Sequence, residues 1–216
     1  MDRRALPDGE DRAQLLGMGE QVVRMLRGVR DGFVHLDIAP LQEAARTAQA
    51  VHRQERALID LMVKRAAAIN LHVEREDEAV FLPMHLDRIV SNIELLAADA
   101  ERVLREGAMF TDRATREIRG LLDTVIALVD DLHDALRTGN RTLVRSILDG
   151  GRECETRAHE YALQHEQRLI EGVCQPRASS IYLAMLDHVR GIEWHARQLA
   201  EKLVPASGSA YSKIEN

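Results

Sequence analysis

Two glutamates stand where an amphipathic helix would otherwise bury an apolar side chain. Glu55 interrupts a stripe that includes Val51 and Leu58, and Glu155 interrupts one that continues at Ala158. A carboxylate at such a position needs a partner, because burying an unpaired charge costs several kcal/mol. Two interpretations follow: the glutamates lie at the edge of the stripe beside arginines, or they are ligands of a cation.

Histidines strengthen the second interpretation near the C-terminal end of the chain. If two helices pair in antiparallel fashion about residue 175, Glu155 and His159 come close to Gly191 and His195. Imidazole and carboxylate groups on facing helices build transition-metal sites in helix bundles. We therefore expect iron or another divalent transition metal as a candidate cofactor. The alternative is structural, because nine histidines in a helical protein produce such neighbours by chance.

The sequence contains no pattern typical of an enzyme active site. It has no G-x-S-x-G turn, no glycine-rich phosphate loop and no H-E-x-x-H. Gly150 and Gly151 lack the Lys-Ser/Thr of a phosphate loop, so they indicate close helix packing or a kink. Cys154 and Cys174 lack the CxxC spacing of a zinc site and are expected to be small buried residues. We expect no catalytic residues and no enzymatic activity.

The composition favours an all-α fold, because 45% of the 216 residues are hydrophobic but only 3% are aromatic. Alanine, leucine, arginine and glutamate are abundant, and these residues favour helices. The net charge is −6, with acidic and basic residues interleaved, which disfavours nucleic-acid binding. No apolar run approaches the roughly 20 residues of a membrane-spanning helix, and the first residues do not resemble a secretion signal. We expect a soluble, cytoplasmic protein that does not insert into a membrane.

Apolar residues recur every three or four positions, which predicts helices packed at shallow angles. Glycines at 107, 139 and 172 each end such a pattern, as a left-handed C-terminal residue does. Asp37, Thr111 and Asn140 are the expected N-caps of three helices. The predicted helices span residues 11–34, 38–70, 78–106, 112–138, 141–171 and 178–204.

The six segments repeat after about 100 residues, which indicates a tandem duplication. Leu86-Asp87 matches Leu186-Asp187, just as Glu55 matches Glu155. Each half is predicted to be an antiparallel three-helix bundle. The expected organisation is an N-terminal arm (1–10), a first bundle (11–106), a linker from Gly107 to Phe110, a second bundle (111–204) and a disordered tail (205–216).

Two stretches resemble a known family. His165-Glu-Gln-Arg-Leu-Ile-Glu-Gly172, followed by Cys174, Pro176 and Ser179-Ser-Ile-Tyr-Leu-Ala-Met-Leu-Asp187, looks like the last hairpin of PhoU-like domains. Leu86-Asp-Arg-Ile-Val-Ser-Asn-Ile-Glu94 resembles the matching stretch of the first half. The resemblance covers roughly residues 11–204. It is closest to the PhoU-like cytoplasmic domains of sodium/phosphate cotransporters, and it implies six helices in two three-helix bundles.

The resemblance also implies a metal site, with a departure. In the family, an E/D-x-x-x-D motif in the third helix of each half helps to bind metal clusters. Its first acid corresponds to Asp87 and Asp187, whereas Ser91 and Gly191 replace the second acid. Asn92 and Glu94, or His188 and His195, are possible substitutes. A site short of one carboxylate should bind a metal cluster weakly, because affinity follows the number and charge of the ligands.

The expected function is that of a non-enzymatic accessory or regulatory protein of phosphate transport or phosphate signalling. Its partner would be a membrane phosphate transporter or a signalling kinase, contacted at the cytoplasmic face of the membrane. One alternative is a helical bundle that senses or stores iron or a similar metal. Another is a ligand-free scaffold that forms a homodimer, because long amphipathic helices often associate.

Overall fold

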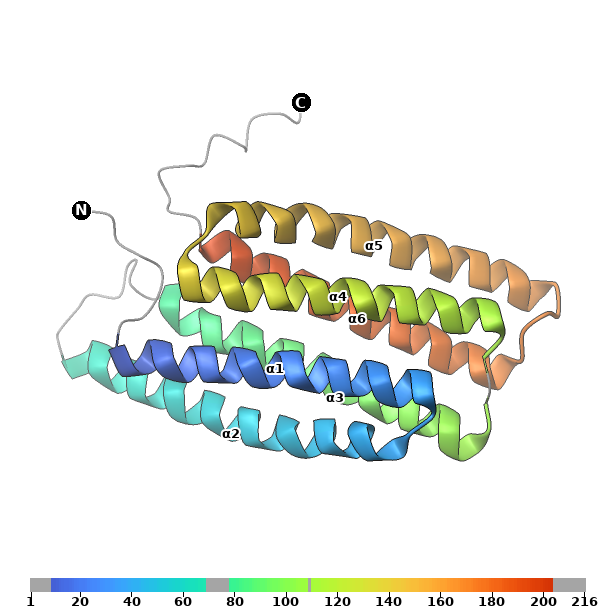
Figure 1. Ribbon diagram of the computed structural model, residues 1–216, viewed down its shortest axis with the longest axis horizontal. Coiled ribbons are helices and arrows are strands. Elements are labelled where there is room, and N and C mark those ends of the chain that lie inside the picture. The colour runs from blue at the N-terminus through green and yellow to red at the C-terminus, as the bar shows by residue number, and fades with distance from the viewer. Residues whose placement is uncertain (1–8, 69–77, 109, 204–216) are drawn as a thin grey trace, which may run out of the picture.

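The computed structural model describes residues 9–68, 78–108 and 110–203, and in these ranges the chain forms helices and no strands. Figure 1 shows their arrangement. The all-α prediction is confirmed, and the predicted segments match the helices to within two residues at every end. The helices are α1 (Gly9–His35), α2 (Ile38–Ala68), α3 (Glu78–Glu106), α4 (Asp112–Thr138), α5 (Arg141–Ile170) and α6 (Pro176–Lys202).

The predicted caps explain where the helices begin. The Thr111 hydroxyl oxygen accepts a hydrogen bond from the Ala114 N–H (3.2 Å), and the Asn140 side chain accepts one from the Thr142 N–H (2.9 Å). The Asp37 carboxylate does the same for the backbone of α2. Each contact satisfies one of the amide groups that a first helical turn leaves free.

Glycine and proline set the other boundaries. Gly139 ends α4 with φ of 68°, and Gly107 and Gly172 also have positive φ, as predicted. Pro176 is the first residue of α6, where its missing N–H costs nothing, so this helix begins two residues earlier than expected. The expected arm overlaps α1, which begins at Gly9. Residues 1–8 of the arm and the expected tail at 205–216 lie outside the described residues.

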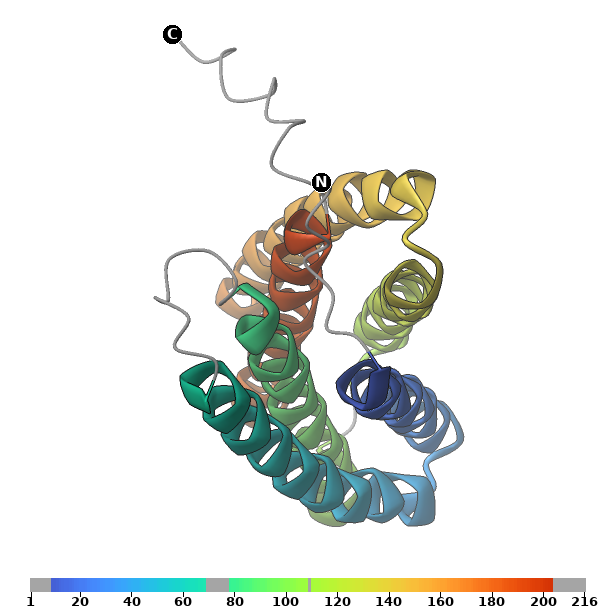
Figure 2. The same cartoon turned by 90° about the vertical axis from the view of Figure 1, so that its left-hand side faces the viewer.

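The chain forms two three-helix halves that lie against each other, as Figures 1 and 2 show. Helices α1, α2 and α3 pack together, as do α4, α5 and α6. The halves meet where α3 packs on α6 and α1 packs on α4. Ion pairs between Arg27 and Asp130 (2.6 Å) and between Arg30 and Asp123 (3.0 Å) show that α1 and α4 run in opposite directions.

One apolar core runs through both halves. The apolar stripe of α3, from Leu86 to Val103, is buried along its whole length, as is that of α4 from Ile118 to Leu136. In α6 the stripe is buried from Met185 to Leu199. Among the described residues, no helix combines the length and the apolarity needed to cross a lipid bilayer.

Helices α3 and α6 cross closely at Gly191. A Cβ atom at this position would lie 2.4 Å from Oδ1 of Asn92, which is closer than such atoms approach one another. The Asn92 side chain is held in place, because its Nδ2 donates a hydrogen bond to the Arg88 carbonyl oxygen (2.8 Å). The second acid of the family motif is thus replaced in the second half by a residue that the crossing of the two halves requires.

Candidate functional site

The first half gathers four ionisable side chains on the outer surface of α2 and α3. We call His52, Glu55, Asp87 and Glu94 the first-half cluster. The His52 imidazole bridges α2 and α3: its Nδ1 contacts the Asp87 carboxylate, and its Nε2 lies 3.4 Å from Oε2 of Glu94. Asp87 and Glu94 share one face of α3 because they are seven residues apart. His52 is a member of the cluster that the sequence analysis did not identify.

The first-half cluster is rich in negative charge and partly open to water. Partial burial and the neighbouring Asp87 carboxylate raise the pKa of Glu55, and nearby arginines oppose this only in part. The side chains of His52 and Asp87 are about one fifth exposed. Among the described residues, no lysine or arginine forms an ion pair with Glu55, Asp87 or Glu94. Asp87 and Glu94 therefore share one imidazole and solvent, with Glu55 beside them.

The corresponding helix pair of the second half is built differently. We call Glu155, Glu193 and Arg197 the second-half cluster. Arg197 donates to Glu193 through Nε (2.7 Å) and to Glu155 through Nη2 (2.9 Å). Glu193 is 1% exposed, and its burial raises its pKa despite the arginine. Gly151 makes room for this arrangement, because a Cβ atom there would lie 2.6 Å from Cγ of Arg197.

The other predicted ligands of the second half do not converge. Asp187 is exposed and pairs with Arg190 (3.3 Å), and His159 is exposed on α5. His195 faces the first half, where its Nδ1 lies 3.1 Å from Nδ1 of His85. Burial, together with the neighbouring His85 and Arg88, lowers the pKa of His195 to about 4.

These positions are a poor fit to the metal site that the family resemblance implies. Within the described residues, no three His, Cys, Asp or Glu side chains are arranged so that they could hold one metal ion. Ser91 donates its hydroxyl to the Asp87 carbonyl oxygen (3.0 Å) and supplies no carboxylate. Of the six predicted ligands, the structure brings only Glu55 and Asp87 together. Metal binding stays a prediction, and we derive no function from it.

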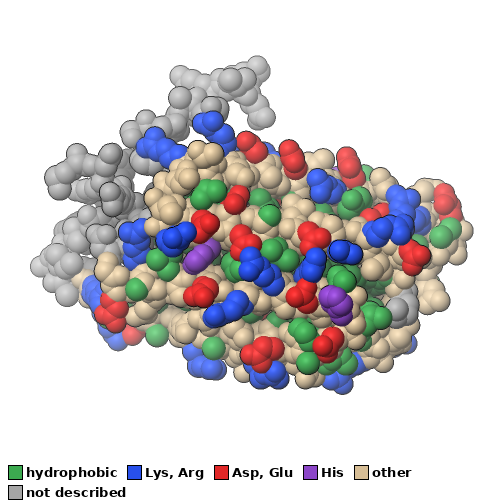
Figure 3. Space-filling view, viewed as in Figure 1, with side chains coloured by type: hydrophobic (Ala, Val, Ile, Leu, Met, Phe, Trp, Pro, Cys, Tyr) green, Lys and Arg blue, Asp and Glu red, His purple; other side chains and the backbone are tan. Residues whose placement is uncertain are grey.

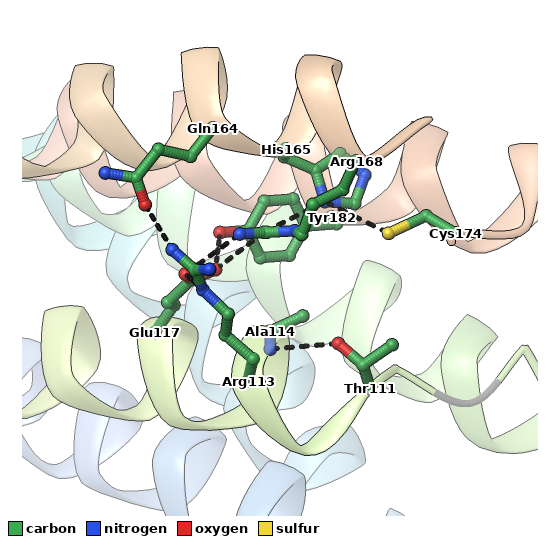
Figure 4. A network of polar contacts seen from close by, with 9 residues as sticks. All are labelled: Thr111, Arg113, Ala114, Glu117, Gln164, His165, Arg168, Cys174 and Tyr182. Carbon is green, nitrogen blue, oxygen red and sulfur yellow. Dashed lines mark hydrogen bonds and ion pairs between the residues drawn. The ribbon is translucent and has the colours of Figure 1, made fainter. Parts of the chain in front are cut away.

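A buried network that the sequence analysis missed lies at the end of the second half where α4 and α6 begin and α5 ends (Figure 4). Glu117 of α4 is 7% exposed and accepts hydrogen bonds from the Tyr182 hydroxyl (2.5 Å) and from Arg168 Nη2 (2.9 Å). Arg113 adds a third donor at 2.8 Å and also contacts Gln164. The network thus ties together α4, α5 and α6.

Electrostatics keep this network charged. Burial alone would raise the pKa of Glu117, but hydrogen bonds from Tyr182, Arg168 and Arg113 outweigh it, so the pKa is lowered. Burial and the Glu117 carboxylate raise the pKa of the Tyr182 hydroxyl, which keeps its proton. One sequence signal was available: Glu117 lies one residue before Ile118 of the apolar stripe of α4, where a carboxylate is rarely free of a partner.

Comparison with known proteins identifies the architecture. No protein-family model matches the sequence, and no curated protein is significantly similar to it. Among solved structures, PhoU from Pseudomonas aeruginosa is similar with a TM-score of 0.80 and 20% identity, covering 90% of this chain and 93% of that one. The phosphate transport system regulatory protein PhoU from Streptococcus pneumoniae is similar with a TM-score of 0.76 and 14% identity, covering 90% and 92%. The chain therefore has the fold of the PhoU proteins.

Proposed function

We propose that this protein is a non-enzymatic regulator of phosphate transport. The observation that supports the proposal most strongly is the similarity of 90% of the chain to two PhoU proteins, one of which is described as a phosphate transport system regulatory protein. Almost the whole length of those proteins is matched, so the likeness includes both halves. The proposal does not depend on a bound metal, for which this chain offers few grouped ligands.

The proposed partner is a membrane phosphate transporter or its sensor kinase, contacted at the cytoplasmic face of the membrane. The surface suits a charged partner. Figure 3 shows acidic and basic side chains interspersed over the face formed by α1 and α4. Contacts made through such side chains are weakened by salt, because exposed charges are screened over about 8 Å at physiological ionic strength.

Regulation by contact requires that the protein bind one conformation of its partner more tightly than another. A rigid body is suited to this task, because the single core leaves little freedom between the halves. The two inter-helix contacts of α1 with α4 and of α3 with α6 hold the outer surfaces in fixed positions. We therefore propose that the partner changes conformation while this protein keeps its own.

Phosphate uptake by cells that lack the gene tests the proposal. We expect uptake to lose its normal response to external phosphate, and the unchanged gene to restore that response. A Glu117→Ala copy, which removes the acceptor at the centre of the buried network and so destabilises the fold, should restore it poorly. Purified protein should also bind vesicles that carry the transporter, less at high salt. Normal uptake in the deletion strain together with no vesicle binding would exclude this function.

A further inference from the structure

A small pocket of about 170 Å³ opens between the first turns of α4 and α6 and the end of α5. Its walls include the apolar side chains of Phe110, Val173 and Ala178. Two further wall residues, His165 and Cys174, carry an imidazole and a thiol, which are reactive groups. A cavity of this size admits a few water-sized molecules, because one water occupies about 30 Å³ of the liquid.

Cys174 is not the small buried residue that the sequence predicted. It is half-buried and lines the pocket, and its Sγ lies 4.0 Å from Nδ1 of His165. Its thiol also interacts with the Arg168 guanidinium. Figure 4 shows the sulfur pointing from the segment after α5 toward these two side chains. A thiol beside a cation and a base is the usual setting of a reactive cysteine.

His165 is placed to accept the thiol proton. The ring is 3% exposed, and burial lowers its pKa, so it is neutral. Arg168 Nη2 lies 3.3 Å from the same Nδ1. Because a guanidinium only donates hydrogen bonds, Nδ1 must carry the lone pair and Nε2 the proton. Within the part of the chain that the structure describes, that Nε2 has no hydrogen-bond partner.

Cys154 provides an internal contrast. It is completely buried in the core beside the second-half cluster, and burial raises the pKa of its thiol to about 12. It also lies about 16 Å along α5 from His165, at 1.5 Å per residue. It therefore cannot resolve an oxidised Cys174 by forming a disulfide, because such a bond requires Cα atoms less than about 7 Å apart.

We propose that Cys174 is a redox-modification site, at which hydrogen peroxide converts the thiol to a sulfenic acid. The thiol proton passes to His165 Nδ1 as the Arg168 N–H moves from that nitrogen to the sulfur, and the thiolate sulfur forms a bond to one peroxide oxygen. The O–O bond breaks, and the departing hydroxide takes the proton from His165 and becomes water. Sulfur is oxidised by two electrons and the peroxide is reduced by two. The Arg168 guanidinium stabilises the negative charge on sulfur.

The product is open to a further reversible step. Since Cys154 is out of reach, the sulfenic acid of Cys174 remains available to a small thiol from solution, which would form a mixed disulfide. The added group would fill the pocket against the first turns of α4 and α6. It would also lie beside Arg168, whose other contacts hold Glu117 in the buried network.

Sulfenic-acid labelling of the folded protein tests the proposal. The native protein is treated with hydrogen peroxide and dimedone, and adducts are located by peptide mass spectrometry. We expect one adduct, on Cys174, formed at least about tenfold faster than any on Cys154, because buried thiols are inert. The adduct should disappear in Cys174→Ser and persist in Cys154→Ser. Equal labelling of both cysteines, or labelling of Cys154 alone, would overturn the proposal.

A second measurement separates a thiol activated by its neighbours from one that is merely exposed. The rate at Cys174 is compared between native protein and protein unfolded in urea. We expect the native rate to be higher, because only the folded chain places His165 and Arg168 beside the sulfur. His165→Gln, checked for folding by circular dichroism, should slow the native reaction and leave the unfolded rate unchanged. A native rate at or below the unfolded rate would show that the pocket does not activate the thiol.

Discussion

The first-half and second-half clusters occupy the same kind of helix pair but use their carboxylates differently. In the first half, Asp87 and Glu94 share His52 and water. In the second, Arg197 binds Glu193 and Glu155. An arginine that fills the site converts acids into structural residues, because its fixed donors satisfy the carboxylates in place of an ion or solvent. If either half binds a cation, we therefore expect it to be the first, where no arginine occupies the carboxylates of the described residues.

The largest effect should come from the buried network of the second half. Glu117→Ala would leave the Arg168 guanidinium and the Tyr182 hydroxyl buried without their acceptor. Removing one partner of a buried ion pair costs about 3–5 kcal/mol, so the free energy of unfolding should fall by that amount. Urea unfolding followed by circular dichroism measures it. Asp187→Ala, at an exposed position, is the control, and a loss below 1 kcal/mol in Glu117→Ala would contradict the assignment.

The two clusters should differ by a smaller amount in how much they contribute to the free energy of unfolding. Arg197→Met should lower the free energy of unfolding by about 3 kcal/mol, because Glu193 would stay buried without its partner. His52→Ala should cost less than about 1 kcal/mol, because the carboxylates it contacts reach water. The same unfolding experiment measures both. The double variant Arg197→Met/Glu193→Gln should recover most of the loss; equal losses in Arg197→Met and His52→Ala would remove the distinction between the halves.

Restoring the missing acid should have different effects in the two halves. Ser91→Asp adds a carboxylate beside Asp87 and should tighten binding of zinc or manganese at least about tenfold, as measured by calorimetric titration. Gly191→Asp should instead lower the free energy of unfolding by about 1–3 kcal/mol, since its Cβ atom would collide with Asn92. Elemental analysis of each variant, purified without chelator, gives a second readout. Equal metal affinity in the two variants would contradict this prediction.

The smallest expected effect is on the pH dependence of stability, through His195 at the contact between the halves. The pKa of His195 is about 4 in the folded protein, below its ordinary value of 6.5. The unfolded chain therefore binds more protons between these values, so stability present above pH 6.5 is lost as the pH falls toward 4. After allowance for solvent, His195 should account for about 1 kcal/mol of this loss. His195→Gln should remove that part of the pH dependence, and exposed His159→Gln should not. Unchanged curves for both variants would disprove it.

The sequence alone could predict the helices because each signal was local. Thr111 and Asn140 cap their own helices, Gly139 ends one, and the apolar period defines a buried face within a single segment. Such features depend on residues at most four positions apart. The duplication followed from their order along the chain, and the PhoU-like arrangement was implied by the resemblance of two stretches to that family. The solved PhoU structures confirm the fold.

The sites were harder to predict because they depend on which way a side chain points across two helices. One of the two interpretations of Glu155 set it beside an arginine, and the other made it a metal ligand. Its partner in the structure, Arg197, could not be identified by spacing. His195 was expected to face α5 and instead contacts His85 of the other half. The network around Glu117 joins residues 51 and 65 positions apart, and no short motif encodes such a contact.

The close crossing at Gly191 has a consequence for how the two halves could evolve. Where a duplicated half needs a carboxylate for a metal, this chain needs the absence of a side chain, because Asn92 fills that space. An acid at residue 191 would have to displace the Asn92 side chain, so a substitution there would disturb the contact between the halves. Packing between the halves therefore constrains this position of the second half.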